Sequence, residues 1–196
     1  MKRFFCCSAL AVVLVFGLGA HRTFAQTAPA GASFDIKAQL LTDLQGMKTK
    51  YVGLAQAIPA EKYTWRPGDG VRSVSEVFLH AALMNFAFTP MAGATPPEGF
   101  SRQKYEVSTT DKAKVIDQLN QSFDYSQNAI QKLSDADIQK SVKMFGHDAP
   151  AAAVLFFMDT DLHEHLGQMI SYARMNGVVP PWTAAAAAKQ GGPRPE

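Results

Sequence analysis

Apolar residues recur at alternating spacings of three and four along four long segments of this chain. Because an α-helix turns once every 3.6 residues, this spacing places the apolar side chains on one face of a helix. The predicted helices cover residues 34–58, 73–88, 111–133 and 151–176. No run of alternating β-branched residues lies between turn signals, so strands are not expected. The pattern predicts an all-α protein, a four-helix bundle in a single domain.

Residues that start or stop helices stand at the predicted boundaries. Pro59 ends the first helix, because proline lacks the amide that a helix interior needs. Ser73–Glu76 is a capping-box sequence that opens the second helix, and Asn176–Gly177 is a C-cap signal that closes the fourth. The connection over residues 134–150 is expected to be a loop, with a short helix at 134–140. These signals support four separate helices rather than fewer, longer ones.

The first 25 residues have the features of a secretory signal peptide. Lys2 and Arg3 precede an apolar run over residues 4–20, and Thr23–Ala25 supplies the small residues of a cleavage site after Ala25. An uncleaved anchor is the alternative, because a run of about 17 residues is near the lower limit for a membrane span. We therefore expect a periplasmic or secreted protein with no stable membrane association once the signal is removed.

The predicted organisation is a signal peptide at 1–25, a flexible lead-in at 26–33, the bundle at 34–182 and a disordered tail at 183–196. Both cysteines, Cys6 and Cys7, lie in the signal, so the mature chain has no disulfide and no cysteine ligand for a metal. The mature chain has 16 basic and 17 acidic residues and no basic cluster, which argues against a nucleic-acid partner. Phosphate-binding glycine loops and serine nucleophile elbows are also absent from the sequence.

His165 occupies a position of the fourth predicted helix where the pattern requires an apolar, inward-facing residue. Asp161 lies four residues earlier and therefore on the same face. His80 falls on the inward stripe of the second predicted helix. An Asp/His pair one turn apart, joined by a histidine from another helix, is a geometry that binds metal ions. We predict a metal site of His80, Asp161 and His165.

The same residues also fit a site without metal. Burying ionisable groups is costly unless they are paired or bind a metal, and Asp161 could simply fix the tautomer of His165 in a buried hydrogen-bond network. His163 lies about 200° around the helix from His165, so it should face outward beside Glu164. Only a local distortion of the helix would let His163 replace Asp161 as a ligand. His147 is expected at the surface.

Three stretches of the chain resemble the DinB/YfiT-like superfamily of four-helix bundles. Residues 61–80 read EKYTWRPGDGVRSVSEVFLH and resemble that family's loop and second helix, which ends in its first metal histidine. Residues 164–177 read EHLGQMISYARMNG and resemble its last helix. Residues 178–181, VVPP, match the exit from that helix. The resemblance spans residues 34–182, nearly the whole mature chain.

The resemblance implies a divalent metal, most often zinc or nickel, held by three histidines at the open end of the bundle. His80 and His165 match two of those histidines, and Asp161 stands where the family has the third. A carboxylate can bind zinc and also suits manganese or iron, so the substitution is compatible with a site. Characterised relatives include thiol transferases and a maleylpyruvate isomerase, which act in the cytoplasm, whereas this chain is expected to be exported.

Together these observations predict an exported DinB-like protein with a divalent-metal site and a small-molecule substrate. The implied chemistry is thiol-transferase-like or hydrolytic, with metal activation of a thiol or water. No catalytic residue is assigned beyond the metal ligands. The alternative is a non-catalytic binding or interaction bundle without metal. A homodimer is compatible with such a bundle, although no feature of the sequence requires one.

Overall fold

The structure is a computed structural model in which residues 35–189 and 191 are described. The predicted signal peptide, residues 1–25, and lead-in, residues 26–33, lie outside the described residues, so both stay predictions.

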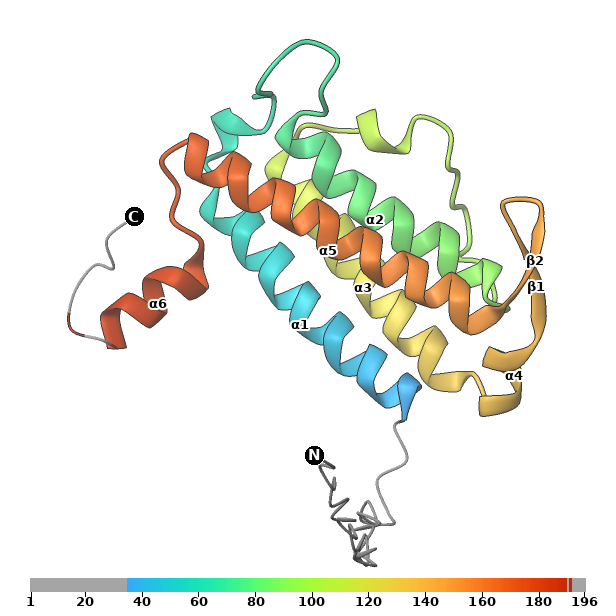
Figure 1. The fold of residues 1–196 in the computed structure, drawn as a ribbon. Helices are drawn as coiled ribbons and strands as arrows, with labels where there is room; N and C mark the ends of the chain where they lie inside the picture. The colour runs from blue at the N-terminus through green and yellow to red at the C-terminus, as the bar shows by residue number, and fades with distance from the viewer. Residues whose placement is uncertain (1–34, 190, 192–196) are drawn as a thin grey trace, which may run out of the picture. The chain divides into compact units, whose positions relative to one another are not determined.

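Within the described residues, four long helices form the body of the protein (Figure 1). They are α1 (Ile36–Ala57), α2 (Val74–Met91), α3 (Lys112–Lys132) and α5 (Ala151–Met175). The shorter elements are η1 (Ala60–Lys62), η2 (Tyr105–Val107), α4 (Asp135–Gln139), β1 (Ser141–Met144), β2 (His147–Pro150) and α6 (Pro181–Lys189). The predicted four-helix bundle is confirmed, as is the short helix in the connection before α5.

The packing order of the helices differs from their order in the chain. Helix α1 packs against α3 and α5, and α2 packs against the same two helices. Helices α1 and α2 therefore occupy opposite corners of the bundle, and α5 lies between them, as Figure 1 shows for α1, α5 and α2. This arrangement gives α5 two neighbours whose side chains can meet its own, one on each flank.

Large apolar side chains fill the centre of the bundle. Tyr51, Phe78 and Phe123 are completely buried, and the ring of Tyr51 lies 6.4 Å from that of Phe78 and 5.7 Å from that of Phe123. The Tyr51 hydroxyl donates a hydrogen bond to the backbone carbonyl of Leu162 at 2.6 Å. Each buried ring contributes about 1.5–3 kcal/mol through removal of apolar surface from water. The hydroxyl joins α1 to the middle of α5.

Side-chain caps begin the long helices where the sequence predicts them. The Ser73 hydroxyl accepts a hydrogen bond from the Glu76 amide, and the Glu76 carboxylate accepts one from the Ser73 amide at 2.6 Å. Asp111 caps α3 by accepting from the Lys114 amide at 2.9 Å. Helix α2 continues to Met91, past the predicted end at Phe88, and Pro90 lies in its last turn.

Residues 141–150 form a β-hairpin, which corrects the expectation that no strands occur. Strands β1 and β2 pair antiparallel, with Met144 opposite His147. The two turn residues, Phe145 and Gly146, have φ values of 49° and 85°, as a type I′ turn requires. Phenylalanine disfavours this backbone region, but the Phe145 ring packs 5.1 Å from that of Phe157. The hairpin was missed because its strands are short and its turn lacks the usual Asn or Asp.

Helix α6 corrects the expectation of a disordered tail from residue 183. Its alanine run has the highest intrinsic helix propensity, and Pro181 stands at its first position, where the missing amide is not needed. The Trp182 side chain packs partly buried against the core, and Pro181 faces Gly53 of α1. Residues 190 and 192–196 lie outside the described part of the chain. Among the described helices, none is both long enough and apolar enough to cross a bilayer.

The capping box predicts a measurable loss of stability in Ser73→Ala. The variant leaves the partly buried Glu76 amide without its acceptor, so we expect the free energy of unfolding to fall by about 1 kcal/mol. Ser171→Ala is the matched control, because the Ser171 hydroxyl is exposed and bonds only within its own helix. The control should change stability by less than ~0.5 kcal/mol in chemical denaturation. Equal effects of the two substitutions would contradict the prediction.

Candidate metal site

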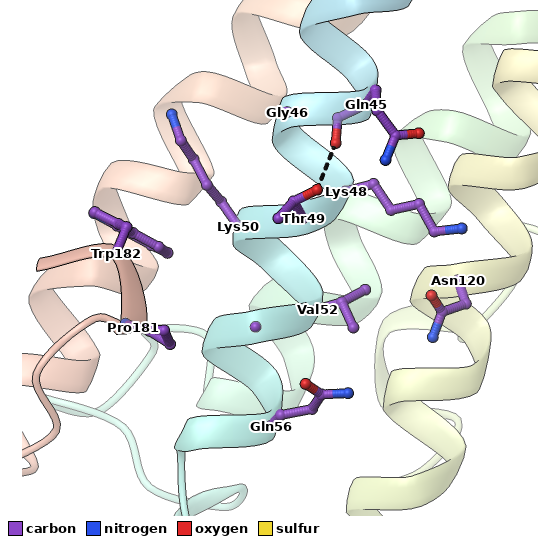
Figure 2. Close-up of a pocket in the computed structure, with 11 residues that line it drawn as sticks. Gln45, Gly46, Lys48, Thr49, Lys50, Val52, Gln56, Asn120, Pro181 and Trp182 are labelled. Atoms are coloured by element: carbon purple, nitrogen blue, oxygen red, sulfur yellow. Dashed lines mark hydrogen bonds between the residues drawn. The ribbon is translucent and has the colours of Figure 1, made fainter. Parts of the chain in front are cut away.

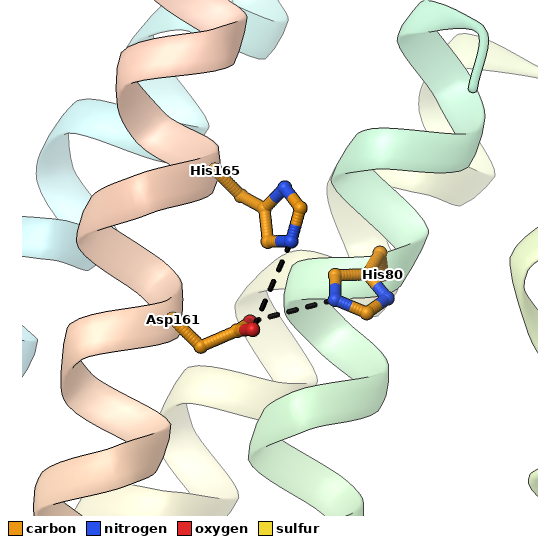
Figure 3. A group of neighbouring side chains, drawn as sticks. All are labelled: His80, Asp161 and His165. Carbon is orange, nitrogen blue, oxygen red and sulfur yellow. Dashed lines mark ion pairs between the residues drawn. The ribbon is translucent and has the colours of Figure 1, made fainter. Parts of the chain in front are cut away.

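His80, Asp161 and His165 lie together where α2 packs against α5. Asp161 and His165 project from successive turns of α5, and His80 faces them from α2 (Figure 3). One donor atom from each residue lies within 4.8 Å of the donor atoms of the other two. The side chains are mostly buried, with 12% of His80, 16% of Asp161 and 12% of His165 exposed. The structure thus brings together the three residues that the sequence singles out.

The Asp161 carboxylate faces both imidazole rings. Its Oδ2 atom lies 3.4 Å from Nε2 of His80, and its Oδ1 atom lies 3.8 Å from Nε2 of His165. The two rings are 4.4 Å apart between centroids, at an angle of 72°. Oδ2 is buried and accepts no hydrogen bond from any described residue. A buried carboxylate oxygen without a donor costs about 1–3 kcal/mol or more, and a cation between the three side chains would remove that cost.

Glu106 orients the His80 ring from the other side. Nδ1 of His80 lies 2.6 Å from Oε1 of Glu106, and the Arg72 guanidinium holds the same carboxylate through two contacts of 2.6 and 3.2 Å. Burial would raise the pKa of Glu106, but His80 and Arg72 outweigh it and lower that pKa to about 2. Because the ionised carboxylate only accepts, Nδ1 must carry the proton. In the neutral ring, the Nε2 atom of His80 then carries a free lone pair.

His165 is oriented in the same way by a neutral partner. Its Nδ1 atom lies 2.8 Å from Oε1 of Gln168, and the Gln168 amide donates to the Tyr172 hydroxyl at 2.9 Å. The Tyr172 hydroxyl donates in turn to the backbone carbonyl of Arg72 at 3.1 Å. This chain of bonds joins α5 to the loop that carries Arg72. Both histidines therefore direct Nε2, rather than Nδ1, toward Asp161.

The charge balance around His80 also permits a form without metal. Burial lowers the pKa of His80, but the carboxylates of Asp161 and Glu106 more than compensate, and Arg72 opposes them only in part. The net effect raises the pKa of His80 above its ordinary value. A protonated His80 would donate to both carboxylates at once. The site can therefore be neutralised by a proton as well as by a cation.

His163 and His147 lie away from this cluster. His163 is half exposed on the opposite flank of α5, where its Nε2 atom lies 2.5 Å from Oδ2 of Asp43 on α1. The helix is regular through residues 159–165, so His163 does not replace Asp161 beside His80. The outward direction predicted for His163 is correct, but its partner is Asp43 rather than Glu164. His147 is exposed on β2.

The partners of the two histidines were missed by sequence reasoning. Glu106 lies in η2, within the long connection between α2 and α3, and no spacing rule relates it to His80, 26 positions earlier in the chain. Gln168 carries a usable signal, because it lies three residues after His165 on the same helix face.

Trp65 and Tyr63 anchor the loop before α2 on the bundle. The Trp65 ring lies 5.3 Å from that of Tyr172, and the Tyr63 hydroxyl donates a hydrogen bond to the Ala55 carbonyl.

Two surface depressions lie apart from the His/Asp cluster. The larger, about 650 Å³, extends along α1, and Figure 2 shows its lining on both flanks of that helix. Lys50 and Trp182 lie on one flank, and Lys48 and Asn120 lie on the other. A second depression of about 460 Å³ borders the loop before η2. Neither lining converges acid–base or metal-binding groups on one point, so we place the candidate chemistry at the α2–α5 contact.

The fold and the cluster define a helical bundle with metal-binding residues on two adjacent helices. The sequence profile of the DinB superfamily matches residues 43–169, which is more than half of the chain. The protein belongs to the DinB superfamily, and the resemblance seen in its sequence is confirmed.

Solved structures share this fold at low sequence identity. A DinB-like protein from Bacillus cereus ATCC 10987 matches with a TM-score of 0.65 and 16% identity, over 74% of this chain and 95% of its own. YfiT from Bacillus subtilis matches with a TM-score of 0.55 and 15% identity, over 77% of this chain and 93% of its own. It is described as a probable metal-dependent hydrolase with an unusual four-helix bundle topology. The mycothiol-dependent maleylpyruvate isomerase matches with a TM-score of 0.57 and 14% identity, over 68% of this chain and 60% of its own. Among curated proteins, none matches this chain.

The hydrogen bonds to Nδ1 predict the tautomer of both histidines. In metal-free protein at a pH where the rings are neutral, we expect His80 and His165 to carry the proton on Nδ1, measured by long-range ¹H–¹⁵N correlation spectra. Glu106→Ala should abolish this preference at His80 and leave it intact at His165, because Gln168 is unaffected. Wild-type protein with the Nε2-protonated form at both residues would show that the cluster is oriented differently.

Proposed function

We propose that this protein binds a divalent metal ion through Nε2 of His80, Nε2 of His165 and the carboxylate of Asp161. The observation that carries the proposal is the buried Oδ2 atom of Asp161, which lacks a donor among the described residues although two imidazole Nε2 atoms face its carboxylate. Both Nδ1 atoms are engaged by other side chains, so both Nε2 lone pairs are available. Metal-binding histidines have this arrangement of outer partners.

The donor set limits which metal fits. Two imidazoles and one carboxylate suit zinc and nickel, and also accept manganese or iron. Three protein ligands leave at least one coordination position open, which is typical of catalytic rather than structural sites. The described residues supply no thiolate, since both cysteines precede residue 26. The metal is therefore bound by nitrogen and oxygen alone.

We further propose that the site acts on a small-molecule substrate, by hydrolysis or by transfer of a thiol. Two structural neighbours, one described as a probable metal-dependent hydrolase and the other as a mycothiol-dependent maleylpyruvate isomerase, support this range. A divalent ion held there would act as a Lewis acid and lower the pKa of a thiol or a water molecule. Glu106 holds the proton at Nδ1 of His80, Arg72 keeps Glu106 ionised, and the partly buried ligands restrict the access of bulk water.

The second candidate function is a non-catalytic bundle without metal. The raised pKa of His80 favours it, because a protonated His80 between Asp161 and Glu106 would balance the charge of the cluster. In that case the three residues stabilise the α2–α5 contact and the protein acts by binding a partner elsewhere on its surface.

Metal analysis separates the two functions. Mature protein is purified without affinity-tag metal and then loaded with zinc. The His80→Ala/His165→Ala variant should bind about one zinc ion per chain fewer than the wild type, because two of the three ligands are gone. His147→Ala is the control, because that histidine is exposed on the hairpin and should not alter the metal content. Circular dichroism verifies that each variant is folded. Equal zinc content in wild-type and double-variant protein would refute the proposed site.

The same proposal includes export, which the signal-peptide features support. Expression of the full chain in a bacterial host should yield a periplasmic or secreted product whose first residue is Gln26, determined by N-terminal sequencing. Replacing Ala25 by a large residue, as in Ala25→Phe, should block this cleavage, since the site needs a small side chain. A cytoplasmic product that begins at Met1 would contradict export.

A further inference from the structure

Helix α5 carries two interleaved Asp/His pairs. Asp161 and His165 form one pair, and Asp159 and His163 form the other with the same spacing of four residues. A shift of two residues turns the helix by about 200°, so the second pair points to a different neighbour. The first pair faces α2, and the second faces α1, which also packs against α5. The chain thus presents the same ligand pattern to both adjacent helices.

Asp43 of α1 completes the second group as His80 of α2 completes the first. One donor atom from each of Asp43, Asp159 and His163 lies within 4.8 Å of the donor atoms of the other two. The contact between Nε2 of His163 and Oδ2 of Asp43 provides a partner for both of these residues. Asp159 remains: its Oδ1 atom is buried and accepts no hydrogen bond from any described residue. Burial and the neighbouring Asp43 carboxylate raise the pKa of Asp159 to about 6, which His163 opposes only in part. A cation or a proton would therefore stabilise this pair of carboxylates.

We propose that Asp43, Asp159 and His163 form a second divalent-cation site, separate from the His80 site. Two carboxylates and one imidazole favour an oxygen-preferring ion such as Mn²⁺ over softer metals. The side chains of Asp43 and His163 are 36% and 48% exposed, so an ion can enter from solvent and keep bound waters. The cation joins α1 to the turn of α5 that bears Asp161, and it therefore stiffens the scaffold of the first site.

The competing explanation is a proton held among Asp43, Asp159 and His163 without metal. Both explanations predict that removing His163 reduces stability in metal-free buffer. They differ in the response to a cation, because only a metal site gives bound Mn²⁺ and a higher melting temperature when Mn²⁺ is added. The test therefore measures binding and melting together, in variants that remove each site separately.

The experiment titrates Mn²⁺ into the mature protein and counts bound ions by electron paramagnetic resonance. The His80→Ala/His165→Ala variant should still bind about one Mn²⁺ per chain and melt at a higher temperature when it is added. Combining that variant with Asp43→Asn/His163→Gln should weaken the remaining binding by about tenfold or more and abolish the shift in melting temperature. Asp124→Asn is the matched control, because Asp124 forms an ion pair with Lys48 at 2.6 Å that also joins α1 to another helix.

The outcomes distinguish the two sites. A folded His80→Ala/His165→Ala variant that binds no Mn²⁺ overturns the second site, whether or not the wild-type protein binds metal at the first. Binding that survives Asp43→Asn/His163→Gln in that background also overturns it. If the combined variant is unfolded, Asp43→Asn alone provides the test, since its side chain is partly exposed and nearly unchanged in size. Binding that is lost only in the variants of Asp43 and His163 supports the second site and argues against the first.

Discussion

The contact between α2 and α5 depends on a carboxylate placed between two imidazole rings, in a region largely removed from water. An isolated buried charge costs several kcal/mol, so such a group persists only where partners surround it. Arg72 and Glu106 fix His80, and Gln168 and Tyr172 fix His165, but Oδ2 of Asp161 is left without a donor among the described residues. A cation or a proton between the three side chains would relieve that imbalance.

The helix order of the bundle creates this arrangement. Because α1 and α2 occupy opposite corners, α5 has one neighbour on each flank, and its Asp/His pairs meet different helices. The buried Tyr51 hydroxyl bonds to the Leu162 carbonyl, which holds the middle of α5 in place between the two groups of ligands. A bundle in which consecutive helices were adjacent would pair α5 with α1 and α3, and α2, which carries His80, would lie diagonally across from it. The topology therefore decides which donors meet.

Membership in the DinB superfamily constrains the fold more strongly than the activity. Neighbours at 14–16% identity share the bundle, yet one is described as a probable hydrolase and another as an isomerase. The particular chemistry depends on side chains that differ within one fold. In this protein the side chains that bear on the proposed site include Asp161, which would give it a carboxylate ligand, and Glu106, whose carboxylate is held ionised by His80 and Arg72. These two residues are where substrate and metal preference should be sought.

The sequence by itself determined the four helices, most of their ends and the three central residues of the site. Local rules suffice for these features, since periodicity identifies a helix face and Ser73 or Asp111 supplies a cap for the nearest amides. Only the tertiary structure decided that Glu106 reaches His80 and that His163 meets Asp43, because a loop path and a packing order are not encoded in local spacing. The hairpin belongs to the same class, because its weak local signal is completed by the packing of Phe145. Helix α6 differs, because its alanine run is itself a local helix signal, whereas only the tertiary structure decided that Trp182 packs against the core.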